Sequence, residues 1–450
     1  MKHDLNASDW LRTLYPKEGA ADSFSREVTF QLGEDCTLRC TYCYQICKSP
    51  KAMTWEVAKK CVDLLYKMYD DNDPNGFINK QTKQIILDFI GGEPLMYLDM
   101  MEKISDYFWT EAIKRRHVWA DTFMISMASN GTLYFEPNVQ RFFEKYKGHL
   151  SFSVSIDGPK EMHDACRVYP NGSGSFDIAK RAQDDFNDRF YHTAGTKATI
   201  ARANLPYLGE LIDYYVQQGY NQIHANYVYE EQWTVDDAKL LYKEMKELAD
   251  YILSLDHEVE VSLFEDNFFS PKNEDDLQCW CGGTGKMLAF DTDGIAYPCV
   301  RYMGSSLGKD QPPLTIGDCN VGIYNTEKDK ETRRMLESVD RRTQSTDECF
   351  YCPIAEGCSY CSAWNYQLYG TPDSRCTYIC PMHKARSLAN VYFWNKKYIK
   401  ENIHKYFHRY LPDEESLKFI DKDELDMLDD LEMKNKIKEN SQLVNGHSVN

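Results

Sequence analysis

Apolar residues recur along the chain with two spacings, which together predict alternating strands and helices. Short apolar or alternating runs predict strands at 28–32, 84–89, 122–128, 150–156, 196–201 and 222–227. Amphipathic spacing predicts helices after most of them, for example at 54–69, 99–115 and 208–218. Strand and helix pairs joined by right-handed crossovers form a parallel sheet with helices outside it. The pattern therefore predicts an α/β fold, as an open doubly wound sheet or as a full or partial barrel.

The loops after the first four expected strands carry the residues best suited to chemistry. A cysteine-rich loop follows the first strand, and the next three loops read Gly91-Gly92-Glu93-Pro94, Ser129-Asn130-Gly131-Thr132 and Asp157-Gly158-Pro159. Because the carboxyl ends of parallel strands lie at one edge of a sheet, we expect these four loops to converge on one face.

The strand and helix pattern ends near residue 264, where short runs rich in Gly, Pro and Cys begin. Such runs are typical of a backbone held by metal rather than by apolar packing. A boundary is expected at 265–278. The expected divisions are an N-terminal extension at 1–25, an α/β domain at 26–265, a cysteine-rich domain at 266–383, and a helical segment with a disordered tail at 384–450.

The charge of the chain argues against nucleic acid as its main partner. Its 450 residues include 52 Lys and Arg against 70 Asp and Glu, a formal net charge of −18 at pH 7, which disfavours contact with a phosphate backbone. The N-terminal segment has no apolar signal core, and no window approaches the length of a membrane span. We expect a cytoplasmic protein that binds neither membranes nor nucleic acid.

Sixteen cysteines therefore need an explanation other than structural disulfides, which a reducing cytosol does not keep. Four lie between Cys36 and Cys47, and ten lie between Cys279 and Cys380. This distribution predicts two separate cysteine-rich metal sites. Cys47, Cys61 and Cys166 are expected to be buried thiols or bystanders.

The sharpest pattern is the loop Cys36-x-x-x-Cys40-x-x-Cys43. Three thiolates can hold three corners of a four-iron cluster and leave the fourth iron open to a small molecule. A zinc site would need a fourth ligand, which Cys47 could supply. The loop follows an expected strand and precedes Tyr44, and in this it resembles the cysteine loop of radical S-adenosylmethionine (SAM) enzymes.

That resemblance implies a partial (β/α)6 barrel and a [4Fe-4S] cluster on Cys36, Cys40 and Cys43 whose open iron binds SAM. In the family an electron from the cluster cleaves SAM to a 5′-deoxyadenosyl radical. The resemblance also implies roles in SAM binding for residues of three other loops. They are Gly91, Gly92, Glu93 and Pro94 for the SAM ammonium, Ser155 and Asp157 for its ribose, and Arg167 for its carboxylate.

The C-terminal cysteines are similar to those of the SPASM domain, which carries two auxiliary four-iron clusters in peptide-modifying radical SAM enzymes. On spacing alone, paired Cys-x-x-Cys units also suit a zinc ribbon. The resemblance implies a first cluster on Cys281, Cys299 and Cys361, with Cys279 or Cys319 as candidate fourth ligand. It implies a second cluster on Cys349, Cys352, Cys358 and Cys380.

Two features depart from the SPASM pattern. In the run of four cysteines at Cys349, Cys352, Cys358 and Cys361, two residues separate the last pair. The family usually has three residues there. Cys376 also competes with Cys380, and we favour Cys380. Together the resemblances imply three [4Fe-4S] clusters per chain.

The resemblance leaves several reactions open. Anaerobic sulfatase maturases, which form formylglycine, have an Asp base directly after the cysteine that corresponds to Cys299, where this chain has Val300-Arg301-Tyr302. We therefore favour a maturase of ribosomal peptides with Cys-x-x-x repeats, of the ranthipeptide or sactipeptide type, that joins a Cys sulfur to a carbon. Carbon–carbon cross-linking and epimerisation are competing enzymatic hypotheses, and an iron–sulfur electron carrier or a zinc scaffold is the non-enzymatic one.

The expected partners are a precursor peptide and an electron donor such as flavodoxin or ferredoxin. Several such maturases carry a leader-binding winged helix before the barrel, whereas only some 25 residues precede the first expected strand here. Leader binding would then use the barrel, the SPASM surface, the acidic C-terminal region or a separate protein.

Overall fold

The computed structural model describes residues 25–190, 198–278 and 281–446. Its main sheet has eight strands in the order β12-β11-β10-β9-β1-β2-β3-β4. The strands β1 to β4 are parallel, and Phe30 of β1 lies opposite Phe89 of β2. The parallel strands are β1 (Ser25–Gln31), β2 (Gln84–Ile90), β3 (Met124–Ser129) and β4 (Leu150–Val154). The first four expected strands are thus confirmed.

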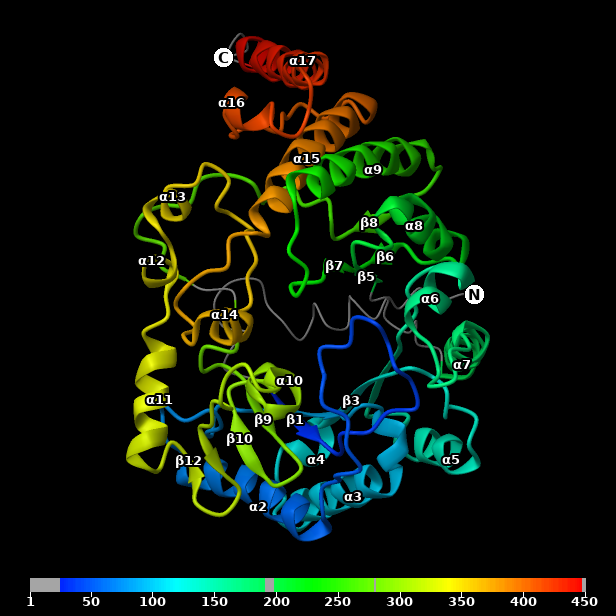
Figure 1. The fold of residues 1–450 in the computed structure, drawn as a ribbon, viewed down its shortest axis with the longest axis vertical. Helices are drawn as coiled ribbons and strands as arrows, with labels where there is room; N and C mark the ends of the chain where they lie inside the picture. The colour runs from blue at the N-terminus through cyan, green and yellow to red at the C-terminus, as the bar shows by residue number, and fades with distance from the viewer. Residues whose placement is uncertain (1–24, 191–197, 279–280, 447–450) are drawn as a thin grey trace.

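Helices cover the outer face of these strands (Figure 1). The first helix begins at a capping residue: the Thr54 side chain accepts a hydrogen bond from the Val57 amide. The helices that accompany strands β1 to β4 are α2 (Trp55–Asp71), η2 (Pro94–Tyr97), α3 (Leu98–Lys114), α4 (Trp119–Thr122), α5 (Pro137–Tyr146), α6 (Lys160–Cys166) and α7 (Phe176–Phe190).

The last two expected strands form short parallel pairs beside the main sheet. The pairs are β5–β7 and β6–β8. The sixth expected strand is divided because its first part pairs with β8 and its second part with β5. The elements here are β5 (Ala198–Ile200), η3 (Leu205–Tyr207), α8 (Leu208–Gln217), β6 (Gln222–Ile223), β7 (Ala225–Tyr227), α9 (Val235–Ser254) and β8 (Glu260–Val261). Residues 196 and 197 lie outside the described part of the chain.

The cysteine-rich region extends the main sheet, because β9 pairs in parallel with β1 and β10 to β12 continue antiparallel. Its helices α11 to α13 lie along one side of the molecule (yellow in Figure 1). The strands are β9 (Leu288–Phe290), β10 (Ile295–Tyr297), β11 (Gly317–Asp318) and β12 (Gly322–Ile323). The helices are η4 (Val300–Tyr302), α10 (Gly304–Leu307), α11 (Glu327–Glu337), α12 (Arg341–Gln344), α13 (Asp347–Phe350) and α14 (Ser362–Tyr369).

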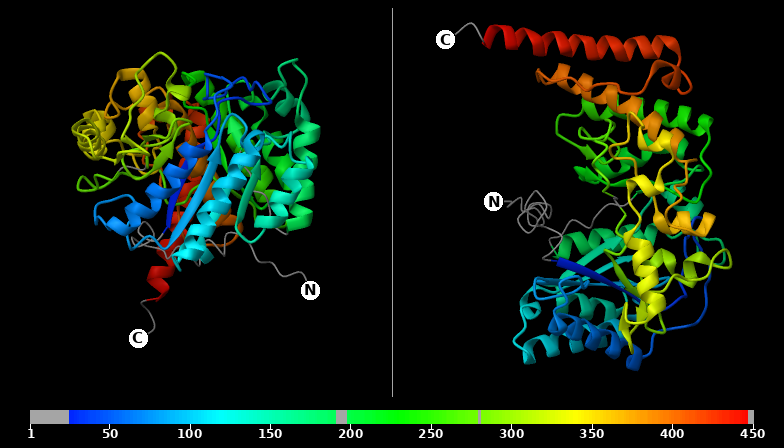
Figure 2. Two further views of the ribbon diagram at one scale, coloured as in Figure 1. Left: turned by 90° about the horizontal axis from the view of Figure 1, so that it is seen from below. Right: turned by 90° about the vertical axis from the view of Figure 1, so that its left-hand side faces the viewer.

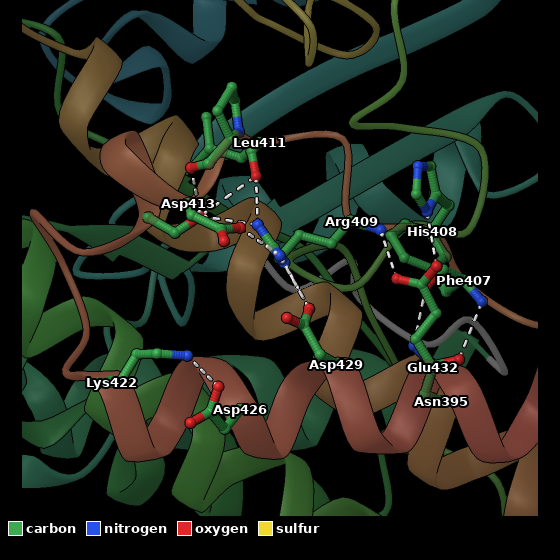
Figure 3. A network of polar contacts seen from close by, with 12 residues as sticks. Asn395, Phe407, His408, Arg409, Leu411, Asp413, Lys422, Asp426, Asp429 and Glu432 are labelled. Atoms are coloured by element: carbon green, nitrogen blue, oxygen red, sulfur yellow. Dashed lines mark hydrogen bonds and ion pairs between the residues drawn. The ribbon is translucent and has the colours of Figure 1, made fainter.

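The C-terminal segment is helical, in α15 (Cys380–Lys400), α16 (Asp413–Ser416) and α17 (Lys422–Gly446). Figure 2 shows α15 between α17 and the rest of the molecule. Polar contacts fix α17 in place: Arg409 donates to Asp429 and Asp413, and Glu432 accepts from His408 and from the Arg409 amide (Figure 3).

The buried apolar residues of the described ranges form two hydrophobic cores. One joins β1 to β4 and their helices with β9, β10 and α10, and includes Phe30, Phe89 and Phe290. The other joins β5 to β8, α8 and α9 with the C-terminal helices, and includes Met245 and Leu388. Packing therefore links each half of the barrel to a segment that follows it in the chain. No helix in the described ranges is both long and apolar enough to cross a membrane.

Candidate functional site

The cysteine loop after β1 is held against the segment that follows α6. The Arg39 amide donates to the Val168 carbonyl across 2.7 Å, and the Thr41 amide donates to the Cys166 carbonyl across 3.0 Å. These contacts fix the loop on both sides of Cys40. The thiols of Cys36 and Cys43 lie near enough to that of Cys40 to affect its pKa.

The pKa of the Cys40 thiol depends on its burial and on the thiols near it. Burial raises the pKa of the Cys40 thiol to about 11, and the neighbouring thiols of Cys43 and Cys36 contribute to the rise, whereas Arg167 opposes it. Lys48 Nζ lies 3.4 Å from Cys43 Sγ. Burial disfavours the charged thiolate form of Cys40, whereas a bound metal would stabilise that form.

The glycine loop after β2 touches the cysteine loop directly. A Cβ atom on Gly92 would lie 2.2 Å from the Asp35 carbonyl oxygen and 2.7 Å from Cys36 Cβ. The Glu93 amide donates to the same carbonyl across 3.1 Å. Only glycine at 92 permits this approach, so the second loop holds the backbone of the first cysteine.

Glu93 is 1% exposed, and its carboxylate joins the loops that follow β2 and β3. It accepts hydrogen bonds from the Leu95 amide at 3.1 Å, the Ser129 hydroxyl at 2.8 Å and the Asn130 amide at 2.8 Å. Burial raises the pKa of this carboxyl, and the three hydrogen bonds oppose the rise. Glu93 therefore braces the convergent loops, and Pro94 begins the short helix η2 behind it.

Asp157 and Arg167 form a buried ion pair beside Cys40. Arg167 Nε donates to Asp157 Oδ2 across 2.9 Å, and the Tyr42 hydroxyl donates to the same oxygen. Among the described residues, Asp157 Oδ1 is buried without a hydrogen-bond partner. A buried acceptor without a donor fits a bound hydroxyl group. Ser155 lies just past β4, where its amide donates to the Ser129 carbonyl.

The first group of C-terminal cysteines brings Cys281, Cys299 and Cys361 together. A Cβ atom on Gly283 would lie 3.5 Å from the sulfur of Cys281 and 3.3 Å from that of Cys299. Burial raises the pKa of the Cys299 thiol, and the nearby thiols of Cys361 and Cys281 add to this. Cys281 Sγ also lies 3.1 Å from the Ser362 hydroxyl, next to Cys361.

Of the two candidate fourth ligands, the structure places Cys319 elsewhere. Its thiol pairs with that of Cys61 on α2, and a hydrogen bond from Cys61 lowers the pKa of Cys319 to about 7. Cys319 is thus not brought to the first group, because the turn at Gly294 holds it against α2. Cys279 lies outside the described residues.

The second group brings together Cys349, Cys352, Cys358 and Cys380. A hydrogen bond between the thiols of Cys349 and Cys380 lowers the pKa of Cys349. The thiols of Cys349 and Cys352 in turn raise the pKa of Cys358, which burial raises most. Arg375 Nη1 lies 3.7 Å from Cys358 Sγ.

Cys376 is placed apart from this group. It is 6% exposed, and its amide donates to Asn365 Oδ1. Its thiol forms a hydrogen bond with Tyr378. Cys166 is also buried, whereas Cys47 is exposed, contrary to a buried role for that residue.

The donors in all three groups are thiols. In the described ranges, no three Cys, His, Asp or Glu side chains are grouped so that they could hold one metal ion. In an iron–sulfur cluster each iron is bound by a separate thiolate, so the type of donor fits such a cluster.

A cavity of about 410 Å³ opens beside the cysteine loop. Its wall includes Tyr42, Cys43 and Tyr44 from that loop, Ala201 and Val228 past β5 and β7, and Arg301 and Trp364 from the cysteine-rich region. The two cysteine-rich parts of the chain therefore face one space.

The sequence did not predict Arg301, Glu230 or Trp364, which line this cavity, as site residues. In the sequence, Arg301 stands out only because the segment after Cys299 lacks an Asp, and Glu230 and Trp364 carry no signal. Arg301 Nη2 lies 2.6 Å from Glu230 Oε1. The position of Arg301 two residues after Cys299 was the one available clue.

No protein-family model matches the chain. An uncharacterized protein of Methanocaldococcus jannaschii is 30% identical over 201 residues, 44% of this chain and 61% of that protein. The serine-type anaerobic sulfatase-maturating enzyme of Bacteroides thetaiotaomicron is 32% identical over 149 residues, 32% of each chain. The radical SAM cyclopropyl synthase TigE of Paramaledivibacter caminithermalis is 21% identical over 363 residues, 74% of this chain and 67% of TigE. The chain spans less than two thirds of the first two relatives.

Solved structures resemble the chain over most of its length. anSMEcpe with bound AdoMet has a TM-score of 0.57 and 17% identity, covering 84% of this chain and 99% of its own. Streptococcus suis SuiB bound to the precursor peptide SuiA has a TM-score of 0.51 and 15% identity, covering 79% of this chain and 76% of its own. These likenesses show that the chain has the fold of the radical SAM enzymes, as the sequence predicted.

Proposed function

We propose that this protein is a radical SAM peptide maturase that joins a cysteine sulfur of a ribosomally made peptide to a carbon of a nearby residue. The observation that carries the proposal is the single cavity faced by Cys43, by the ends of β5 and β7, and by Arg301 and Trp364. A substrate there would lie between the cysteine loop and the first group of C-terminal cysteines.

The cysteines would hold three [4Fe-4S] clusters. Cys36, Cys40 and Cys43 would bind the cluster at the cavity, which when bound supplies the electron that cleaves SAM. Cys281, Cys299 and Cys361 would bind the first auxiliary cluster, with Cys279 as the remaining candidate for its fourth ligand. Cys349, Cys352, Cys358 and Cys380 would bind the second.

The chain's own residues would prepare the site for SAM. Gly91 and Gly92 let the second loop approach the cysteine loop, and Glu93 fixes the position of both. Asp157 offers a buried acceptor for a ribose hydroxyl, and Arg167 a guanidinium for a carboxylate. Ser155, two residues before Asp157 and just past β4, would add a hydroxyl.

The reaction would remove two hydrogens from the peptide for each bond. One hydrogen atom leaves the acceptor carbon to the 5′-deoxyadenosyl radical, and the sulfur loses a proton as it bonds to that carbon. The first auxiliary cluster, which Cys281, Cys299 and Cys361 would hold, would supply the acceptor for the remaining electron. A flavodoxin or ferredoxin would supply the electron that starts each turnover.

Formylglycine formation, the reaction expected of anaerobic sulfatase maturases, is less well supported. Val300 directly follows Cys299, so no carboxylate base stands at that position. Carbon–carbon cross-linking and epimerisation of a peptide compete with thioether formation, because each can begin with hydrogen abstraction in the same cavity.

Mass spectrometry of a treated precursor peptide, before and after alkylation with iodoacetamide, tests the proposal. A thioether lowers the mass by two hydrogens and removes one alkylatable thiol, whereas a carbon–carbon bond spares the thiols and epimerisation changes neither. Formylglycine made from Cys consumes a thiol without joining two residues. We expect hydrogen loss matched by thiol loss. A mass decrease with every thiol still alkylated would support carbon–carbon bonding instead.

A further inference from the structure

Arg301 links three segments that are far apart in the sequence. Its guanidinium carbon lies 5.2 Å from the centre of the Tyr44 ring and 5.9 Å from that of the Trp364 ring. Nη2 lies 2.6 Å from Glu230, in the loop after β7. The side chain is 15% exposed and lines the cavity beside Cys43.

The surroundings of Arg301 are themselves fixed. The Trp364 amide donates to Cys361 Sγ across 3.4 Å, and its indole donates to the Tyr378 hydroxyl. The Tyr378 hydroxyl donates to the Tyr229 carbonyl across 2.7 Å. The loop that carries Glu230 is therefore attached to the cysteine-rich region both at that residue and at the one before it. A guanidinium held in this way loses little freedom when it binds a ligand.

The guanidinium also has donors from which no described residue accepts a hydrogen bond. It carries five N–H groups, and Glu230 is its only carboxylate partner among the residues that the structure describes. The other donors belong to a side chain that lines the cavity wall, within reach of whatever occupies the cavity.

We propose that Arg301 is a substrate-binding residue that donates hydrogen bonds to main-chain carbonyl groups of the bound peptide, an inference that rests on the proposed function. It would orient the peptide between Tyr44 and Trp364 with one stretch of backbone facing Cys43. Peptide recognition through carbonyl groups does not depend on side-chain identity, so the same residue would serve successive positions of a repeated precursor.

The charges of the cavity favour a carbonyl over a carboxylate as ligand. Glu230 already neutralises Arg301, and Glu231 also lines the cavity. A substrate carboxylate would place a further negative charge beside one guanidinium in a partly buried space, where like charges repel strongly. A neutral carbonyl accepts from the free N–H groups without that repulsion.

Peptide binding in the absence of turnover tests this proposal. The probe is a fluorescein-labelled, C-terminally amidated peptide with two Cys-Gly-Gly-Gly units, added to the iron-loaded full chain with SAM and without reductant. Fluorescence anisotropy gives its Kd for the wild type and for Arg301→Lys, which keeps the charge but loses the planar fork. We expect Arg301→Lys to bind at least tenfold more weakly while its cluster absorption and thermal unfolding stay unchanged.

Probes with single ester linkages identify the carbonyl without altering the protein. An ester carbonyl is a weaker acceptor than an amide, so one ester position should weaken binding to the wild type and not to Arg301→Lys. A third probe, with one Gly replaced by Asp, should bind the wild type no more tightly than the first. It should gain affinity in Glu230→Gln, which removes the competing charge.

The outcomes separate the two proposals. Equal binding by the wild type and Arg301→Lys, or the absence of any ester effect, would overturn the role of Arg301 and leave the peptide maturase intact. Tighter binding of the Asp probe to the wild type would replace a carbonyl ligand with a carboxylate. A wild type that cleaves SAM but binds none of the probes would contradict the Cys-x-x-x peptide substrate and the role of Arg301 together.

Discussion

Arg167 donates from Nε to Oδ2 of Asp157 across 2.9 Å, and the carboxylate of Asp157 is completely buried. The pair lies beside Cys40, whose pKa responds to both residues. A buried pair of this kind makes each partner depend on the other, because removal of one leaves an uncompensated charge. It also leaves one carboxylate oxygen without a partner among the described residues.

Asp157→Asn should therefore lower both stability and SAM binding. The neutral amide cannot compensate Arg167, and breaking such a pair costs about 3–5 kcal/mol. Thermal unfolding and equilibrium dialysis of SAM measure the two effects. Asp188→Asn removes the same charge from an exposed position of α7 and should change neither. Unaltered SAM affinity in Asp157→Asn would show that Asp157 does not face the cofactor.

Gly92→Ala should disrupt the cysteine loop. The new Cβ atom would lie 2.2 Å from the Asp35 carbonyl oxygen, so backbone must shift at Cys36, and such overpacking typically costs about 1–3 kcal/mol. Iron content and reductive SAM cleavage to 5′-deoxyadenosine should fall together. Gly209→Ala is the control, because its Cβ atom would meet nothing within 4 Å. Full activity of Gly92→Ala would contradict the close approach of the two loops.

Cys380→Ala should lose the second auxiliary cluster, whereas Cys376→Ala should keep it. The thiol of Cys380 is hydrogen-bonded to that of Cys349, whereas the thiol of Cys376 forms a hydrogen bond with Tyr378. After anaerobic reconstitution we expect about twelve irons in the wild type and in Cys376→Ala, from three four-iron clusters. Equal iron loss in the two variants would refute the assignment, and zinc in place of iron would refute the SPASM clusters.

The docking of α17 should weaken in acid through Glu432. Burial raises the pKa of this carboxyl, but hydrogen bonds from Lys436, His408 and the Arg409 amide outweigh it, so the pKa lies below its ordinary 4.5. A depressed pKa means that the stabilisation is complete above pH 4.5 and is lost as the pH falls through the lower folded value. Hydrogen exchange of α17 should therefore accelerate below pH 4.5.

Glu432→Gln removes this dependence. It should weaken the docking of α17 by about 1–3 kcal/mol at neutral pH, because a buried hydrogen-bonded charge is lost. Asp430→Asn, at an exposed position of the same helix, should stay within about 0.5 kcal/mol of the wild type. If exchange in Glu432→Gln keeps the acid response of the wild type, another group is responsible.

The sequence predicted the four parallel strands of the main sheet, because apolar spacing reports directly on which residues a sheet must bury. It also predicted which thiols gather locally: Cys36, Cys40 and Cys43 lie in one loop, so chain connectivity keeps them close. The residues around Cys380 favoured it over Cys376, and the structure brings Cys380 to Cys349.

Only the tertiary structure decided which distant residues meet. The sequence offered Cys319 as a cluster ligand, but the β11 turn packs against α2 and pairs it with Cys61. It gave no reason to join Arg301 with Glu230 and Tyr44, because no spacing relates three residues on three separate segments. The two hydrophobic cores likewise combine segments that are far apart in the sequence. Local patterns set the elements and the short-range ligand groups, whereas contacts between segments depend on how those elements pack.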